Sequence, residues 1–227
     1  MSDVLQRDAD SVRYIVLRKL ASGLRHALMG ELQTVEFFAE FANRLIDKDA
    51  EQAKLRECIE KIPAATQAAA RTSHSMIEWL RPDEEATAPV GDTVRQCMKL
   101  AGDDWGLRGI VATADIPGEA SETKLAKAAA LELIVASLLT MTDARPGPMD
   151  IEIVARRDRD ELELSFVGRR SERVATFTPS ITYYTLTWQD LAVLASDHGV
   201  ACSFDDNALS LRFPVAVGAA AGGDSDH

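Results

Sequence analysis

Residues 149–168, MDIEIVARRDRDELELSFVG, contain two runs of alternating apolar and polar side chains around a charged middle. In the second run, Leu162, Leu164 and Phe166 share one face of an extended chain, while glutamate and serine side chains occupy the other face. This alternation is typical of strands that bury one face. The stretch therefore predicts two neighbouring strands of a sheet with one covered side.

The segments around this strand pair predict a layered domain at 91–217. Runs of strands mixed with apolar helices indicate one sheet with helices packed on one side. The expected helices are 91–102, 123–142 and 187–199, and the further expected strands are 109–117, 200–206 and 208–216. The tail, 218–227, is small and polar and is expected to be disordered.

The spacing of apolar residues is different in the chain before this domain. Apolar residues recur every three, four and seven positions from 11 to 47, and a second helical run covers 51–80, with Pro63 expected to kink it. Two long helices joined by a tight turn lie antiparallel. The sequence thus predicts a helical hairpin at 11–82, a flexible start at 1–10 and a linker at 83–90, in an α+β chain.

Such a hairpin has too little core to stand alone. Two copies are therefore expected to pair into a dimeric four-helix bundle.

Composition and charge narrow the class of function. The 227 residues carry a net charge of -11 and have a pI near 4.9, which argues against nucleic-acid binding and favours protein partners. Three cysteines, far apart in the sequence, suggest neither a disulfide framework nor a zinc site, as in a reduced cytoplasmic setting. The start lacks the pattern of a signal peptide, and no segment is apolar enough to predict a membrane span.

A single histidine interrupts the first helix in GLRHALMGEL, residues 23–32. On a helical wheel His26 lies about 150° from the centre of the apolar face, so its imidazole is expected to face solvent. Gly23 and Gly30 lie within about 60° of it, which suggests a low surface for docking a partner or, alternatively, relief of crowding between helices. Arg25, about 100° away, is either a phosphoryl contact or a solvated surface residue.

This order of elements resembles the core of bacterial sensor histidine kinases, in which a dimerisation and phosphotransfer hairpin precedes a Bergerat-type ATP-binding domain. The segment LRHALMGEL is similar to the phosphoacceptor box of that family, with His26 at the histidine position. Ala27 stands where the family has an acidic residue, and Gly30 stands where it has Thr or Asn. The resemblance implies that His26 is the phosphoacceptor.

The nucleotide motifs of that family are replaced in this chain. VASLLTMTDA aligns with the asparagine box, but Ser137 and Met141 occupy its two Asn positions, and a thioether is a poor ligand for Mg²⁺. FVGRR aligns with the adenine-binding DxGxG box, with Phe166 for the Asp and Arg170 for the second Gly. The stretch 169–187, where the family has its glycine-rich lid, contains no glycine.

A kinase shape without these motifs resembles the histidine phosphotransferases derived from sensor kinases. The resemblance implies a homodimer that relays a phosphoryl group from the receiver domain of a hybrid histidine kinase to that of a response regulator. It also implies no cofactor or metal bound by this chain, with Mg²⁺ supplied by the receiver.

Two other functions fit the same pattern: a divergent histidine kinase that still uses ATP, and a scaffold that binds a regulator without phosphoryl chemistry. Two other histidines are also considered. His74, in the second hairpin helix, is a rival phosphoacceptor, and His198 is expected to place a charge at the end of a helix.

Overall fold

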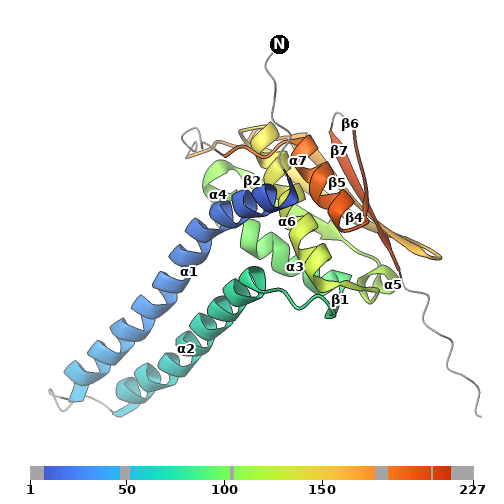
Figure 1. The fold of residues 1–227 in the computed structure, drawn as a ribbon. Helices are drawn as coiled ribbons and strands as arrows, with labels where there is room; N and C mark the ends of the chain where they lie inside the picture. The colour runs from blue at the N-terminus through green and yellow to red at the C-terminus, as the bar shows by residue number, and fades with distance from the viewer. Residues whose placement is uncertain (1–7, 47–51, 103–104, 177–183, 206, 216–227) are drawn as a thin grey trace, which may run out of the picture. The chain divides into compact units, whose positions relative to one another are not determined.

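The computed structural model describes residues 8–46, 52–102, 105–176, 184–205 and 207–215 (Figure 1). The chain divides into two compact units. One comprises residues 17–83, and the other comprises residues 1–16 together with 84–227. Of the predicted flexible start at 1–10, residues 1–7 lie outside the described residues, whereas Ala9 and Asp10 already belong to the first helix. The predicted disordered tail at 218–227 also lies outside the described residues.

The smaller unit is a helical hairpin. Helix α1 runs from Ala9–Ile46 and α2 from Gln52–Leu80, and α2 contains Pro63. Its helices touch near the middle of the hairpin, where Thr72 Oγ1 donates a hydrogen bond to Glu31 Oε1 at 3.1 Å.

The larger unit is built on a five-stranded mixed sheet with the order β2-β4-β5-β7-β6. Strand β2 pairs parallel with β4, and the other three pairings are antiparallel. The strands are β2 (Ile110–Asp115), β4 (Met149–Asp158), β5 (Glu161–Arg170), β6 (Ala201–Asp205) and β7 (Ala208–Pro214). A second, two-stranded sheet joins β1 (Thr87–Pro89) to β3 (Lys124–Ala126).

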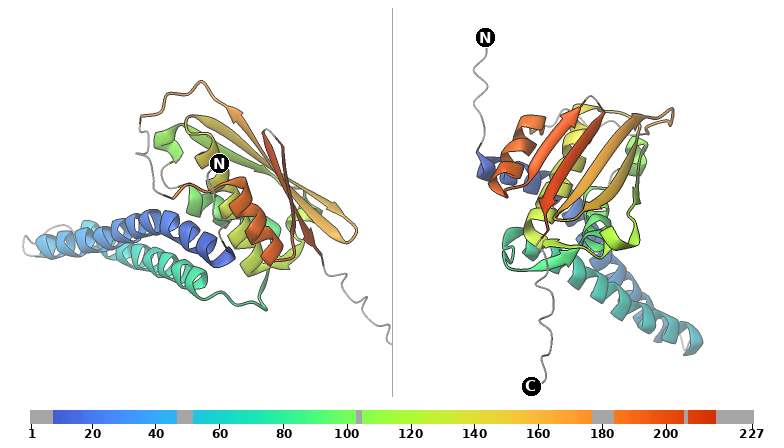
Figure 2. Two further views of the ribbon diagram at one scale, coloured as in Figure 1. Left: turned by 45° about the horizontal axis from the view of Figure 1, so that its top comes forward. Right: turned by 90° about the vertical axis from the view of Figure 1, so that its right-hand side faces the viewer.

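Three helices cover one face of the large sheet: α3 (Val90–Ala101), α6 (Lys127–Ala144) and α7 (Trp188–Asp197) (Figure 2). Helix α6 is apolar nearly all round because it lies inside this layer, with Leu133, Ile134 and Leu138 fully buried. Helix α7 begins with a capping box, in which the side chains of Thr187 and Asp190 each accept a backbone N–H of the other. Two short helices, α4 (Trp105–Arg108) and α5 (Gly118–Ser121), complete the unit.

The alternation in 161–168 correctly predicts which side of β5 is covered. Leu162, Leu164 and Phe166 are completely buried under the helices. The predicted fold class is therefore confirmed: a long helical hairpin followed by a mixed sheet with helices packed on one face.

Three features differ from the sequence-based expectation. Residues Lys124–Ala126, expected within a helix at 123–142, form strand β3, and helix α6 begins only at Lys127. The expected linker at 83–90 contains strand β1, whose three residues pair with β3. The beginning of α1 groups with the α/β unit, because Val12, Ile15 and Val16 are buried there, whereas the sequence assigned the whole helix to the hairpin. In the described part of the chain, no helix is long and apolar enough to cross a membrane.

Candidate functional site

The imidazole of His26 is exposed on α1. Among the described residues it has no hydrogen-bond or ion-pair partner, so both ring nitrogens are open to another molecule. Leu24, two positions earlier, is 6% exposed and points to the opposite side of the helix. The helix thus presents His26 to solvent, as its period predicts.

The neighbours predicted for docking share this exposed setting to different degrees. Arg25 and Gly30 are exposed and Gly23 is half-buried. A Cβ atom added to Gly30 would meet no atom within 4 Å outside its own helix, so crowding within this chain does not require glycine there. The open space at Gly30 leaves room for another protein to approach the helix beside His26.

His74, on α2, is also exposed. The hydrogen bond between Thr72 and Glu31 shows which residues of the two antiparallel helices lie opposite each other. His74, two residues after Thr72, is level with Met29, about 4.5 Å along the axis from His26. His74 therefore lies within one helical turn of the level of His26, but on the other helix of the hairpin.

In the α/β unit, the positions that correspond to nucleotide motifs are used for packing. Phe166 is completely buried between its cross-strand partners Ile153 and Leu209. The Ser137 hydroxyl is also buried and donates to the Leu133 carbonyl at 2.7 Å, one turn back in α6. Neither side chain is available to hold a ligand.

The side chain of Met141, on α6, packs against the sheet at Gly168, next to the positions just described. A Cβ atom added to Gly168 would lie 2.9 Å from the Met141 methyl carbon and 3.2 Å from the sulfur of Met149. The two thioethers therefore lie against this glycine. No group of three or more His, Cys, Asp or Glu that could hold a metal is found within the described ranges.

The described residues of the stretch 169–187 are tied to the body of the unit at several points. The Ser171 N–H donates to the Pro148 carbonyl at 3.1 Å, and the Thr176 N–H donates to the Leu107 carbonyl at 2.9 Å. At the far end, the Leu186 N–H donates to Asp143 Oδ2 at 2.8 Å. Residues 177–183 lie outside the described part.

A charged cluster that the sequence did not predict joins the first turns of α1 to α6 and α7. Arg13 Nε donates to both oxygens of Glu132, at 2.9 and 3.1 Å, and its Nη2 donates to Asp197. His198 Nε2 bonds the same Glu132 carboxylate, a contact that the sequence did not predict. The hydrogen bond and the charge of Arg13 lower the pKa of Asp197.

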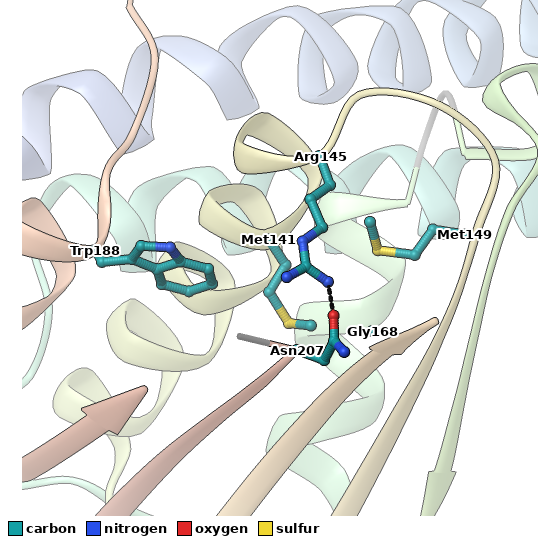
Figure 3. A pocket seen from close by; sticks show the side chains of 6 residues that line it. All are labelled: Met141, Arg145, Met149, Gly168, Trp188 and Asn207. Atoms are coloured by element: carbon teal, nitrogen blue, oxygen red, sulfur yellow. Dashed lines mark hydrogen bonds between the residues drawn. The ribbon is translucent and has the colours of Figure 1, made fainter. Parts of the chain in front are cut away.

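A small pocket is the other feature that sequence reasoning missed. Its lining comes from the end of α6, the start of α7 and the sheet (Figure 3). The lining residues are Met141, Arg145, Met149, Gly168, Trp188 and Asn207. Replacement of the DxGxG and asparagine boxes pointed to this region, but nothing in the sequence indicated Arg145, Trp188 or Asn207.

Comparisons with known proteins find distant structural likeness only. No family model and no curated protein matches the chain. The chain is similar to the histidine kinase AdeS of Acinetobacter baumannii, with 10% identity, coverage of 82% of this chain and 98% of the other, and a TM-score of 0.43.

Two further solved structures are similar over nearly the whole chain. A histidine kinase from Burkholderia phymatum STM815 has 14% identity, coverage of 89% of this chain and 96% of the other, and a TM-score of 0.43. A bacterial phosphotransferase has 13% identity, coverage of 87% and 94%, and a TM-score of 0.40. With TM-scores below 0.5, these likenesses assign neither a family nor an activity to this chain.

Proposed function

We propose that the chain is a cytoplasmic histidine phosphotransfer protein, in which His26 accepts a phosphoryl group from one receiver domain and gives it to another. The imidazole of His26 on the first hairpin helix is exposed and has no partner among the residues that the structure describes, and this observation carries the proposal. A neutral imidazole is a nucleophile at physiological pH and needs only access to its target. The surface at Gly30, which has open space above it, would allow a globular receiver to approach.

The reaction requires alignment more than activation by this protein. A lone pair on one imidazole nitrogen attacks phosphorus, an N–P bond forms, and the P–O bond of the aspartyl phosphate breaks. The aspartate leaves as a carboxylate, and the proton on the other ring nitrogen of His26 can pass to solvent. Because this transition state is loose, most of the catalysis is positioning and charge neutralisation. The receiver would bring the Mg²⁺ ion.

Packing in the α/β unit supports a phosphoryl donor other than ATP. Phe166 and Ser137 are buried in the fold, and the Met141 thioether, a poor ligand for Mg²⁺, lies against Gly168. The divergent-kinase alternative requires these same positions to bind a nucleotide and a metal.

A reconstituted transfer assay tests the proposal. Purified receiver domains carrying labelled aspartyl phosphate would be mixed with the wild-type protein, with His26→Gln and with His74→Gln. We expect label on the wild-type protein and on His74→Gln, and none on His26→Gln. His74→Gln is the matched control because it removes an exposed imidazole from the neighbouring helix.

Three results would contradict the proposal in different ways. Label from ATP without any receiver would make the protein a kinase. Label that persists in His26→Gln would move the phosphoacceptor elsewhere. A complete absence of label with every receiver of the source cell, while the protein still binds a receiver, would leave the scaffold function.

A further inference from the structure

Helix α1 belongs to both units of the chain. It is one uninterrupted helix from Ala9–Ile46, but residues 9–16 are part of the α/β unit, and residues 17–46 are part of the hairpin unit. Figure 1 shows the blue beginning of this helix beside α6 and α7. The contacts that hold these first two turns therefore hold the start of the helix that also carries His26.

Glu132 lies at the centre of the charged cluster that holds these turns. It is placed in α6 between Leu131 and Leu133, which are 6% and 0% exposed, and its own side chain is 13% exposed. Arg13 Nε donates to both of its carboxylate oxygens, and His198 Nε2 bonds one of them. One nearly buried carboxylate thus has partners from α1 and from the end of α7.

The signs of the charges favour attachment of α1. Arg13 is the cation that α1 contributes, and the carboxylates of Glu132 and Asp197 both accept hydrogen bonds from its guanidinium. Asp10 also pairs with Arg13, at 3.1 Å, but its side chain is 93% exposed and lies on α1 itself. The electrostatic attraction between α1 and the helices of the α/β unit therefore passes through Arg13.

Solvent and dissolved ions can reach this cluster. The side chains of Arg13 and Asp197 are 33% and 47% exposed, and ion pairs open to solvent weaken as salt screens them. The buried apolar residues beside the cluster, Val12, Ile15 and Val16, extend over only two turns. A short attachment of this kind can open locally while the rest of the unit stays folded.

The sheet of the same unit is held by more extensive contacts. Strands β4 and β5 pair along ten residues each, and Leu162, Leu164 and Phe166 of β5 are completely buried. Segments with more buried apolar contacts and more paired backbone groups open at a higher free energy. We therefore expect the beginning of α1 to open before the sheet does.

We propose that the first two turns of α1 form a strap, which the ion pair between Arg13 and Glu132 holds on the α/β unit and which opens without unfolding of the sheet. The strap responds to ionic strength: it is closed at low salt and opens more often when salt screens the ion pair. This device goes beyond the proposed phosphotransfer function and does not depend on the chemistry of His26. It gives the α/β unit a task that needs no nucleotide, because the unit holds one end of the first hairpin helix.

Hydrogen exchange of the full chain, followed by mass spectrometry, tests the strap. The amides of residues 12–16 report on the strap, and the amides of β5 report on the sheet. Raising the sodium chloride concentration from about 0.01 M to about 1 M shortens the Debye length from about 30 Å to about 3 Å. We expect residues 12–16 to exchange faster than β5 at low salt and faster still at high salt, because a detached helix end frays.

Three variants assign the effect to the ion pair. Arg13→Gln and Glu132→Gln should each speed exchange at residues 12–16 about fivefold or more at low salt and reduce the response to salt, because either change removes the pair. Asp10→Asn is the matched control, since it removes a carboxylate from the same arginine but on the same helix, and it should change exchange by less than about twofold. Because Arg13 lies outside α6, Arg13→Gln tests the pair even where Glu132→Gln disturbs the packing of that helix.

Any of four results would overturn the proposal. These are equal exchange rates for residues 12–16 and β5, no response of the wild-type strap to salt, unchanged exchange in Arg13→Gln, or an Asp10→Asn variant that exchanges as fast as Arg13→Gln. The transfer assay with His26→Gln is a separate readout, so failure of the strap and failure of the phosphotransfer function are distinguishable.

Discussion

Glu163, on β5, is a partly exposed carboxyl group whose ionised form is stabilised by its neighbours. Its carboxylate accepts a hydrogen bond from Ser210 Oγ across β5 and β7, and Arg212 Nε lies 3.5 Å away. The Ser210 hydroxyl and the nearby arginines outweigh partial burial and lower the pKa of Glu163. A carboxyl whose folded pKa lies below its unfolded value stabilises the fold above the unfolded pKa, and this stabilisation is lost as the pH falls through the folded value.

We therefore expect Glu163→Gln to make the stability less sensitive to acid. Unfolding by urea would be measured from pH 7 down to below the unfolded glutamate pKa of about 4.3. The wild-type midpoint should fall more steeply than that of Glu163→Gln. Glu161→Gln removes the same charge from an exposed position on the same strand and should follow the wild type. Parallel curves for the wild type and Glu163→Gln would contradict this prediction.

At the scale of one element, the first two turns of α1 are a structural part of the α/β unit. Val12 and Val16 are completely buried and Ile15 is 5% exposed, in the compact unit that contains the sheet. Arg13, between these residues, bonds Glu132 of α6. Buried apolar side chains and the charged Arg13 therefore both attach this short stretch of helix to the α/β unit.

Substitution of adjacent residues tests this role of α1. Ile15→Ala should destabilise the α/β unit by about 2–4 kcal/mol, because it leaves a cavity in a buried seam. Tyr14→Ala, at a neighbouring side chain that is 53% exposed, should cost less than Ile15→Ala. Urea unfolding with a probe on the sheet measures both values. Equal, small effects would mean that the beginning of α1 does not belong to this unit.

The long elements were predictable from sequence because each carries a period. Alternation identified β4 and β5 and the covered side of the sheet, and the helical period identified α1 and α2. The elements β1, β3, α4 and α5 have only three or four residues each, too few for any period to show.

The candidate sites were predictable only in part, for the same physical reason. The exposure of His26 was predictable because its position on the helical wheel lies opposite the apolar face of the same helix. Arg13 and Glu132 are 119 residues apart, and His198 is 66 residues beyond Glu132, so only the folded chain brings them together. The pocket residues also come from separate elements, and no local pattern joins them.

At the scale of the whole molecule, the hairpin unit buries little of its apolar surface. Between Leu17 and Asp83 the buried apolar residues of the described chain are Leu20, Leu24, Ala42, Cys58 and Ala69. Phe37, Phe41 and Ile59 are 61%, 42% and 53% exposed, and the rings of Phe37 and Phe41 are stacked with centroids 6.0 Å apart. Large exposed apolar patches are typical of interaction sites, and a hairpin with a small core can gain one by pairing with a second copy.

We therefore expect a homodimer that depends on the aromatic residues of α1. Phe37→Glu should convert the protein to a monomer, because a charge in an apolar interface is costly to desolvate. Sedimentation velocity over a range of concentrations would measure this, and circular dichroism would show that the helices persist. Val174→Glu, at an apolar residue of the α/β unit that is 84% exposed, should leave the dimer intact. A wild-type protein that stays monomeric at every concentration, or a Phe37→Glu variant that still dimerises, would place the exposed aromatic rings outside any interface between copies.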